Sequence, residues 1–302
     1  MLFRSPLGTL EGTLRPYQKE GVYWLRFLED SGLNGLLADE MGLGKTLQTL
    51  TWLSLPRADP DAQGKPALVI CPTSLVENWN REAETFVPHL RRLVISGPDR
   101  DALFARIPQS DLVITSYALL RRDLDAYRAF KFSVAVLDEA QHIKNRSTQN
   151  AVAAKQICAS GKLVLTGTPI ENSVADMWSI MDFLVPHYLG EYDLFRERYE
   201  LPIAAGDRDG EIAQAKLRRK LHPFILRRLK KDVAKDLPDK IVKVSFCQLT
   251  LDQQRVYNAL LAESRRTIGD LVKAKGFDRA RFEILAILMR LRQVCCHLDL
   301  LK

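Results

Sequence analysis

The stretch "LLADEMGLGKTLQTL", residues 36–50, decides the fold of this chain. It places an apolar strand directly before the loop "DEMGLGKT" and a helical pattern directly after it. Strand, loop and helix in this order are the setting of a phosphate-binding loop, G-x-x-x-x-G-K-[ST]. Asp39 stands where that pattern has its first glycine. The stretch is therefore a working nucleotide site, a degenerate one or a chance glycine turn.

The residue types of the loop favour a working nucleotide site. Gly42 and Gly44 let the backbone curl so that its N–H groups face an anion. Lys45 is expected to bind the β- and γ-phosphates of a nucleotide, and the Thr46 hydroxyl is expected to ligate Mg²⁺. The N-terminus of the following helix adds a favourable dipole for a phosphate.

A second site follows further along the chain, in "SVAVLDEAQH" (133–142). Its apolar run ends at Asp138 and Glu139. A phosphate-loop enzyme needs a carboxylate for Mg²⁺ at the end of a neighbouring buried strand, and a group that orients the attacking water. Asp138 is predicted to be the metal-side acid, and Glu139 the base or water-positioning residue.

The two sites lie in a pattern of strands that alternate with helices. Short apolar runs rich in β-branched residues indicate buried strands at 35–39, 67–72, 92–97, 111–117, 133–140 and 162–169. Helical patterns such as 73–86, in which Trp79 is predicted to be a core residue, lie between most of them. Continuous apolar strands are typical of a sheet covered on both faces. The alternation predicts an α/β fold with a three-layer parallel sheet.

The pattern changes after residue 172. The elements predicted there are a helix over 173–186, helix over 212–237 interrupted at Pro223, a strand over 240–249 and two helices within 251–297. We therefore predict two parts, an α/β core of residues 1–185 and a helical appendage of residues 186–302.

Basic residues are concentrated in the last part of the chain. The net charge is +7, but residues 213–302 carry 21 Lys+Arg against 9 Asp+Glu. Seven of these cations lie between Arg218 and Lys231, among them Arg227 and Arg228, which are candidates to line a nucleic-acid groove. A basic end on a mildly acidic body indicates a polyanionic partner, with a solvated helical surface as the structural alternative.

Composition argues against several other classes of protein. No apolar run reaches the roughly 18 residues of a membrane span, and the N-terminus lacks the apolar core and cleavage site of a secretory signal. The five cysteines are odd in number and unpatterned, which argues against a disulfide framework. Adjacent Cys295 and Cys296 lack the spacing of zinc ligands, so packed helix residues are favoured there. The chain is expected to be intracellular and to have no membrane partner.

Taken together, these motifs resemble the SWI/SNF-like branch of the superfamily-two helicase-related ATPases. In that branch the phosphate loop has the sequence "DEMGLGKT", with aspartate in place of the first glycine. The other resembling segments are "LRPYQKEGVYWL" (14–25), "CPTSLVENWNREAETF" (71–86), "ITSYALL" (114–120), "DEAQHIKN" (138–145), "LTGTPIEN" (165–172), "HPFILRRLKKDVAKDLPDK" (222–240), "QLTLDQQRVYNALL" (248–261) and "LRQVCCHL" (291–298). The resemblance implies a RecA-like fold of the P-loop NTPase type, with ATP and Mg²⁺ as cofactors.

The resemblance also implies roles for particular residues. Gln18 would contact adenine, and His142 would link the nucleotide site to "LTGTPIEN", with a satisfied structural histidine as the alternative. Thr166 and Thr168 would transmit the nucleotide state to the nucleic acid, and a simple strand-to-turn segment is the alternative. The residues implied to hold the phosphates of one strand are Thr73, Ser74, Thr115 and Ser116. Helix and strand capping is their structural alternative.

The function implied is that of the N-terminal ATPase lobe of a translocase, which moves along double-stranded DNA and remodels protein–DNA complexes, with a protein cargo as a further partner. Such motors have a second RecA-like lobe, whose arginine fingers are worth roughly 10³–10⁵ in rate, and no second lobe follows in this sequence. The chain alone is therefore expected to bind Mg-ATP weakly, to hydrolyse it slowly and not to translocate. The favoured location is the cytoplasm or nucleoid of a prokaryote, with the nucleus as the eukaryotic alternative.

Other functions stay open. A strand-separating helicase or restriction-type motor subunit shares the ATP machinery, but "DEMGLGKT" and "HPFILRRLKKDV" favour the translocase. A non-catalytic module would use the lobe only to dock DNA or a protein, yet Lys45, Thr46, Asp138 and Glu139 are all present. A generic phosphate-loop kinase or GTPase has no reason to carry "LTGTPIEN" and the basic segment.

Overall fold

The computed structural model describes residues 7–57, 60–167, 174–233, 243–277 and 279–301. The chain divides into two compact units, Met1–Leu237 and Pro238–Lys302. Within the described ranges, none of the helices is long and apolar enough to cross a lipid bilayer.

The first unit is built on a parallel sheet. In the described residues, seven strands pair in the order β3-β4-β2-β5-β6-β1-β7, and each pairing is parallel. The strands are β1 (Gly35–Leu37), β2 (Ala67–Cys71), β3 (Arg92–Val94), β4 (Leu112–Ser116), β5 (Phe132–Leu137), β6 (Ala159–Leu165) and β7 (Ile225–Leu226). Leu37 of β1 is in register with Leu165 on one side and Leu226 on the other, so the strand before the phosphate loop is held at both edges.

Helices connect and cover these strands. The α-helices of the first unit are α1 (Pro16–Asp30), α2 (Lys45–Ser54), α3 (Val76–Phe86), α4 (Tyr117–Arg122), α5 (Leu124–Arg128), α6 (Gln149–Lys155), α7 (Val174–Leu184), α8 (Tyr192–Phe195), α9 (Leu201–Ala205), α10 (Arg208–Leu221) and α11 (Lys230–Val233). The shorter or tighter turns are η1 (Gly8–Leu10), η2 (Pro60–Ala62), η3 (Thr73–Leu75), η4 (Arg100–Gln109), η5 (Ala140–His142), η7 (Arg196–Glu200, a π-helical turn) and η8 (His222–Phe224).

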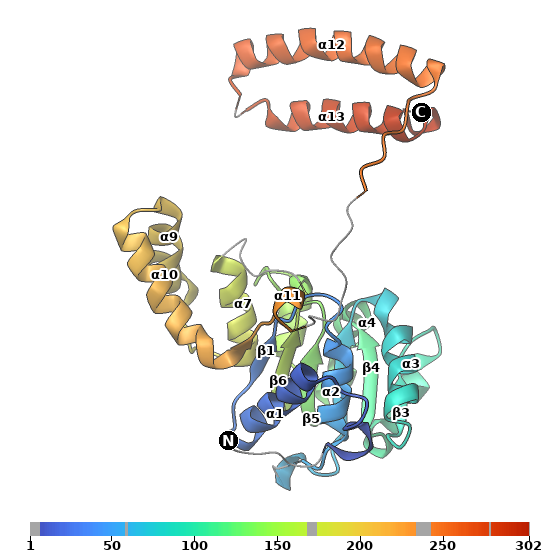
Figure 1. The fold of residues 1–302 in the computed structure, drawn as a ribbon, viewed down its shortest axis with the longest axis vertical. Coiled ribbons are helices and arrows are strands. Elements are labelled where there is room, and N and C mark those ends of the chain that lie inside the picture. Colours follow the sequence, from blue (N-terminus) through green and yellow to red (C-terminus); the bar gives the residue numbers. More distant parts are fainter. Residues whose placement is uncertain (1–6, 58–59, 168–173, 234–242, 278, 302) are drawn as a thin grey trace. The chain divides into compact units, whose positions relative to one another are not determined.

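Alternate residues of each strand face opposite helical layers. Leu36 and Ile70 belong to an apolar cluster that α4, α6 and α7 complete, whereas Leu37 and Val69 belong to a cluster that α1, α2 and α3 complete. Figure 1 draws the strands with the helices of both layers around them. Because side chains alternate along a strand, apolar residues at every position give a sheet that is buried on both faces.

The α/β fold with a parallel sheet is confirmed, and strand residues are present within each range predicted before residue 168, whereas residues 168–169 lie outside the described ranges. The prediction of helix over 212–237, interrupted at Pro223, is wrong at Ile225–Leu226, which form β7, and residues 234–237 lie outside the described ranges. The strand predicted over 240–249 is wrong for residues 243–249, which have no regular structure, and residues 240–242 lie outside the described ranges. The domain boundary after residue 185 stays a prediction, although the sheet takes β7 from beyond it.

The second unit, in its described residues, is an antiparallel helical hairpin of α12 (Leu251–Lys275) and α13 (Arg281–Cys296), followed by η9 (Leu298–Leu301). Thr250 caps α12 by accepting a hydrogen bond from the backbone N–H of Gln253. Gln253 also donates from Nε2 to the carbonyl of Val294 at 3.0 Å, which joins the start of α12 to the end of α13. The two helices predicted within 251–297 are therefore present.

A glycine at the start of β1 is required by packing and not by backbone conformation. A β-carbon added at Gly35 would lie 2.4 Å from Leu28 Cδ1 and 2.8 Å from Trp24 Cη2. We expect Gly35→Ala to lower the free energy of unfolding by roughly 1–3 kcal/mol through overpacking, measured by urea denaturation.

Gly161 of the neighbouring strand β6 offers a matched control. A β-carbon there would meet Val134 Cγ2 at 3.5 Å, an ordinary contact. Gly161→Ala is expected to be neutral or to stabilise by up to about 1 kcal/mol, because it reduces the conformational freedom of the unfolded chain. Equal losses at the two glycines would contradict the packing argument.

Candidate nucleotide site

The phosphate loop joins the end of β1 to the start of α2. Gly42 and Gly44 have φ values of 83° and 74°, in the left-handed region that favours glycine. At Gly44 packing adds a second restriction, because an added β-carbon would lie 2.4 Å from Gln18 Nε2. Both glycines are therefore needed for the path of the loop into α2.

Gln18 connects this loop to the start of α1. Its buried side chain accepts a hydrogen bond from the backbone N–H of Arg15 at 2.9 Å and donates from Nε2 to the carbonyl of Leu43 at 3.2 Å. The structure thus brings the residue that was predicted to contact adenine to the phosphate loop. The contact itself stays a prediction.

Lys45 brings the loop into reach of the second predicted site. Its ammonium donates to the carbonyl of Asp39 at 2.9 Å, with Glu40 O further away at 3.5 Å. Burial lowers the pKa of Lys45, and the charges of Asp39, Asp138 and Glu139 oppose that shift. Lys45 therefore lies in the electrostatic field of the two acids that follow β5. Thr46, in the first turn of α2, is half-buried.

Asp138 is held rigidly at the carboxyl end of β5. Its backbone N–H donates to Ile70 O at 2.9 Å, and its Oδ2 accepts a hydrogen bond from Trp79 Nε1 at 2.8 Å. Tyr117 donates from its hydroxyl to the Asp138 carbonyl at 2.8 Å. Burial raises the pKa of Asp138. Trp79 is a core residue, as predicted, but its bond to the acid was not foreseen.

Glu139 turns the chain sharply away from the strand. Its φ of 55° is unusual for a residue other than glycine, and its N–H donates to Asp138 Oδ1 at 2.9 Å. Its half-exposed carboxylate accepts a hydrogen bond from Gln141 Nε2 at 2.9 Å. The two acids thus differ in environment, because Asp138 is buried and held whereas Glu139 is half-exposed. Between β1 and β5 lies β6, so the prediction that the two sites follow neighbouring strands is wrong.

The segment after β6 approaches the same loop. Thr166 is buried, and its backbone N–H donates to Leu37 O at 3.1 Å. A β-carbon added at Gly167 would lie 2.5 Å from Met41 Cγ and 3.3 Å from Lys45 Nζ. Thr168 lies outside the described residues. His142 stacks on Tyr117 with ring centroids 4.8 Å apart, and Tyr117 contacts Asp138, so His142 is joined to the acid through one ring. The coupling roles of these residues stay predictions.

Asp39, the departure from the strict motif, is an ion-pair residue. Its carboxylate is fully buried and accepts hydrogen bonds from the Arg228 guanidinium, including Nε to Oδ1 at 2.9 Å, and from the Arg228 N–H at 3.1 Å. The same guanidinium donates to Gln48 Oε1 at 2.7 Å and to the carbonyl of Tyr17. A bidentate, hydrogen-bonded pair of this kind can tolerate burial, because its polar groups are satisfied.

Three of the predicted nucleic-acid contacts are engaged inside the protein. The Arg228 side chain is only 10% exposed. The buried Thr115 hydroxyl donates to Ile95 O at 3.2 Å, and the buried Ser116 hydroxyl accepts from Leu119 N at 3.3 Å, which caps α4. These three side chains therefore have structural partners inside the protein, and their contacts with nucleic acid stay predictions. Thr73, Ser74 and Arg227 are exposed, and their contacts with nucleic acid stay predictions.

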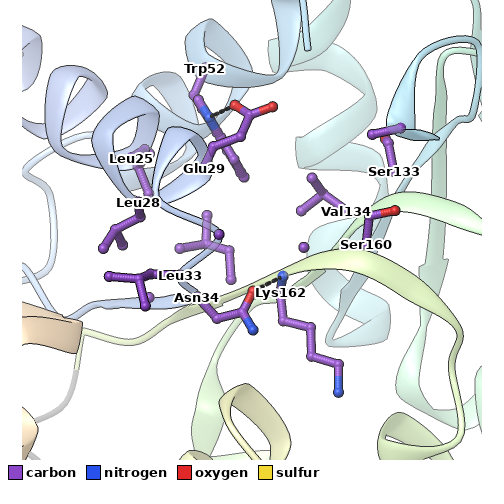
Figure 2. Close-up of a pocket in the computed structure, with 15 residues that line it drawn as sticks. Leu25, Leu28, Glu29, Leu33, Asn34, Trp52, Ser133, Val134, Ser160 and Lys162 are labelled. Atoms are coloured by element: carbon purple, nitrogen blue, oxygen red, sulfur yellow. Dashed lines mark hydrogen bonds between the residues drawn. The ribbon is translucent and has the colours of Figure 1, made fainter. Parts of the chain in front are cut away.

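A cavity of about 150 Å³ lies elsewhere, at the amino end of the strands (Figure 2). Gly35 and Gly161, near the starts of β1 and β6, line it together with Trp52 of α2. Asp39 and Asp138 follow the opposite ends of their strands. Ligands of open parallel sheets bind at the carboxyl ends of the strands, so this cavity is not the nucleotide site.

Comparison with known proteins agrees with this geometry. A family model described as the SNF2-related domain matches residues 17–300. The TATA-binding protein-associated factor MOT1 of Saccharomyces cerevisiae is 35% identical over 316 residues, which cover 98% of this chain and 17% of that protein. The putative ATP-dependent helicase/translocase YwqA of Bacillus subtilis is 40% identical over 294 residues, which cover 96% of this chain and 31% of that protein.

A solved structure is similar as well. The Sulfolobus solfataricus SWI2/SNF2 ATPase core in complex with dsDNA superposes with a TM-score of 0.68 and 40% identity. The alignment covers 95% of this chain and 59% of that one. The chain thus spans part of the length of each of these relatives.

A parallel sheet with a phosphate loop after one strand and an Asp–Glu pair after another defines a RecA-like ATPase core. Within that class, the chain belongs to the SNF2-related family, the family of the SWI2/SNF2 ATPases.

The buried pair of Asp39 and Arg228 gives a direct test of what holds the loop. Removing one partner of a buried pair leaves an uncompensated charge and costs about 3–5 kcal/mol. We expect Arg228→Ala to lower the free energy of unfolding by that amount in chemical denaturation. The double variant with Asp39→Ala should lose less than the sum of the two single variants.

The Arg91–Asp111 pair serves as the control, since its side chains are 66% and 34% exposed. Exposed pairs contribute little to stability, so Arg91→Ala should leave the unfolding midpoint nearly unchanged. Additive losses at Asp39 and Arg228 would refute a coupled pair.

Proposed function

We propose that this chain is the ATP-binding lobe of a motor that moves along double-stranded DNA and remodels protein–DNA complexes. The observation that carries the proposal is that Lys45, in the loop after β1, and the acids Asp138 and Glu139, after β5, follow the carboxyl ends of strands of one parallel sheet. The double-stranded DNA in the Sulfolobus solfataricus complex supports the choice of polymer. Strand separation coupled to ATP hydrolysis would favour the helicase alternative instead.

The residues of this site suit a nucleotide with a divalent cation. Mg²⁺ prefers oxygen ligands, and Thr46 and Asp138 would supply a hydroxyl and a carboxylate. Mg²⁺, when bound, neutralises charge on the phosphates. Lys45 would bind the β- and γ-phosphates in exchange for its bonds to the loop carbonyls. Glu139 would orient a water molecule, and this role is supported by its half-exposed side chain and by the left-handed backbone that turns it away from β5.

Trp79 would keep the metal-side acid in position. It donates to Asp138 Oδ2 while the Glu139 N–H occupies Oδ1, so the carboxylate is prevented from turning. Groups locked by neighbouring hydrogen bonds lose no orientation during a reaction. Asp138 therefore needs no reorganisation to meet a cation.

We further propose that the lobe works with a second RecA-like lobe that supplies arginine fingers. The chain covers 59% of the Sulfolobus solfataricus core and less of the curated relatives. Arginine fingers are worth roughly 10³–10⁵ in rate. On this proposal the 302-residue chain by itself binds Mg-ATP and hydrolyses it slowly.

Variants of Glu139 and Lys45 distinguish ATP hydrolysis from ATP binding. Glu139→Gln keeps the size of the side chain but removes the base, so we expect ATP turnover to fall by about 10²-fold or more. Its ATP affinity, measured with a fluorescent ATP analogue, should stay within about threefold, because general-base catalysis acts on the chemical step. Lys45→Ala should lose the affinity itself. Normal turnover by Glu139→Gln would rule out the assigned role.

Arg227 tests the contact with DNA. It is exposed on the segment that Arg228 anchors. A contact with a DNA phosphate contributes to the binding free energy in a way that depends on salt and not on base sequence. Arg227→Ala should therefore weaken duplex binding and reduce the slope of log K against log salt by about 0.9. Arg91→Ala, which removes an exposed arginine elsewhere, is the control. An unchanged slope would remove Arg227 from the interface.

A further inference from the structure

The segment "RRLKK" (227–231), which follows β7, is bound to the phosphate loop through its backbone. Glu40 of the loop donates its N–H to Arg228 O at 3.0 Å, and its carboxylate accepts a hydrogen bond from the Lys230 N–H at 2.7 Å. With the Asp39–Arg228 pair, these bonds hold Lys230 beside the loop.

The cations of this segment point in two directions. Arg227 and Lys231 are exposed, whereas Arg228 and Lys230 are partly buried. The Arg228 guanidinium donates hydrogen bonds to Asp39, Gln48 and Tyr17. The basic segment is therefore divided between an outward pair and an inward pair, and only the outward pair is suited to a DNA groove.

The side chain of Lys230 lies against the nucleotide loop itself. A β-carbon added at Gly42 would lie 3.2 Å from Lys230 Nζ and 3.3 Å from Lys230 Cε. Gly42 is one of the two left-handed glycines that shape the loop. Among the described residues, none accepts a hydrogen bond from Lys230 Nζ, so the ammonium has donors to offer.

Lys230 and Lys45 both lie beside the phosphate loop. Lys230 Nζ would be 3.2 Å from a β-carbon at Gly42, and Lys45 Nζ is 2.9 Å from the carbonyl of Asp39. Two ammonium groups beside a loop whose N–H groups curl around an anion are stabilised when a polyanion lies between them.

We propose that Lys230 is a second phosphate-binding lysine of the nucleotide site, contacting the phosphate chain of the bound nucleotide next to Gly42. The inference rests on the proposed function, since it adds a ligand-binding residue to the same site. It also links the two activities, because the segment that would contact DNA through Arg227 contacts the nucleotide through Lys230.

The test is nucleotide affinity in the 302-residue chain. Dissociation constants for ATP are measured with a fluorescent analogue, and adenosine, which has no phosphate, is measured by competition. We expect Lys230→Ala to weaken ATP about tenfold or more, as for loss of a hydrogen bond to a charged group, and to leave adenosine within about twofold. Lys230→Arg should retain most of the ATP affinity.

Lys231→Ala is the matched control, because it removes the neighbouring exposed lysine. Its ATP and adenosine affinities should equal those of the unaltered chain. Equal ATP affinities for Lys230→Ala and Lys231→Ala would overturn the inference, and so would an equal loss of ATP and adenosine by Lys230→Ala, which indicates a structural role. Thermal melting of each variant checks that the fold is intact.

Lys45→Ala separates this inference from the proposed function. If Lys45→Ala loses ATP while Lys230→Ala keeps it, the inference alone fails. If the unaltered chain does not bind ATP, the proposed function fails with it.

Discussion

The structure of the site depends on the buried ion pair between Asp39 and Arg228. An ionised carboxylate that is fully removed from water carries a desolvation cost of several kcal/mol, which only close partners offset. Arg228 provides those partners, and its guanidinium also donates hydrogen bonds to Gln48 and to the carbonyl of Tyr17. Because the two residues are 189 positions apart, this pair fixes β7 to the end of β1.

That pair also determines how the phosphate loop is held. The end of β1 and the start of the phosphate loop are held by β7 on one side and β6 on the other. Lys45 then bonds to Asp39 O, and Lys230 is carried to Gly42 by the segment that Arg228 anchors. A glycine at position 39 would remove the carboxylate that pairs with Arg228 and would leave the guanidinium only its neutral acceptors, Gln48 and Tyr17. The aspartate is thus a structural requirement of this arrangement, and Gly44, Lys45 and Thr46 keep the places that they have in the strict motif.

Much of the fold follows from local patterns. The buried strands were predictable because short apolar runs rich in β-branched residues and ending in polar residues are typical of strands buried on both faces of a sheet. Gly42, Gly44, Lys45, Asp138 and Glu139 could be singled out because each belongs to a short contiguous motif, and their chemical roles stay predictions. β7 was missed because two residues beside Pro223 are too short to show a period. Trp79 was recognised as core, but no rule of spacing indicates which polar atom its indole N–H meets.

The sequence by itself determined the α/β class, the phosphate loop, the acidic pair and the family resemblance, since these depend on the order of residues along short stretches. Only the tertiary structure decided the partner of Asp39, the separation of β1 and β5 by β6, and the inward direction of Arg228 and Lys230. The physical reason is that these features depend on contacts between residues distant in the chain. From the sequence alone, the cations of a basic segment cannot be told apart. Their burial in the folded chain shows which of them have a partner inside the protein.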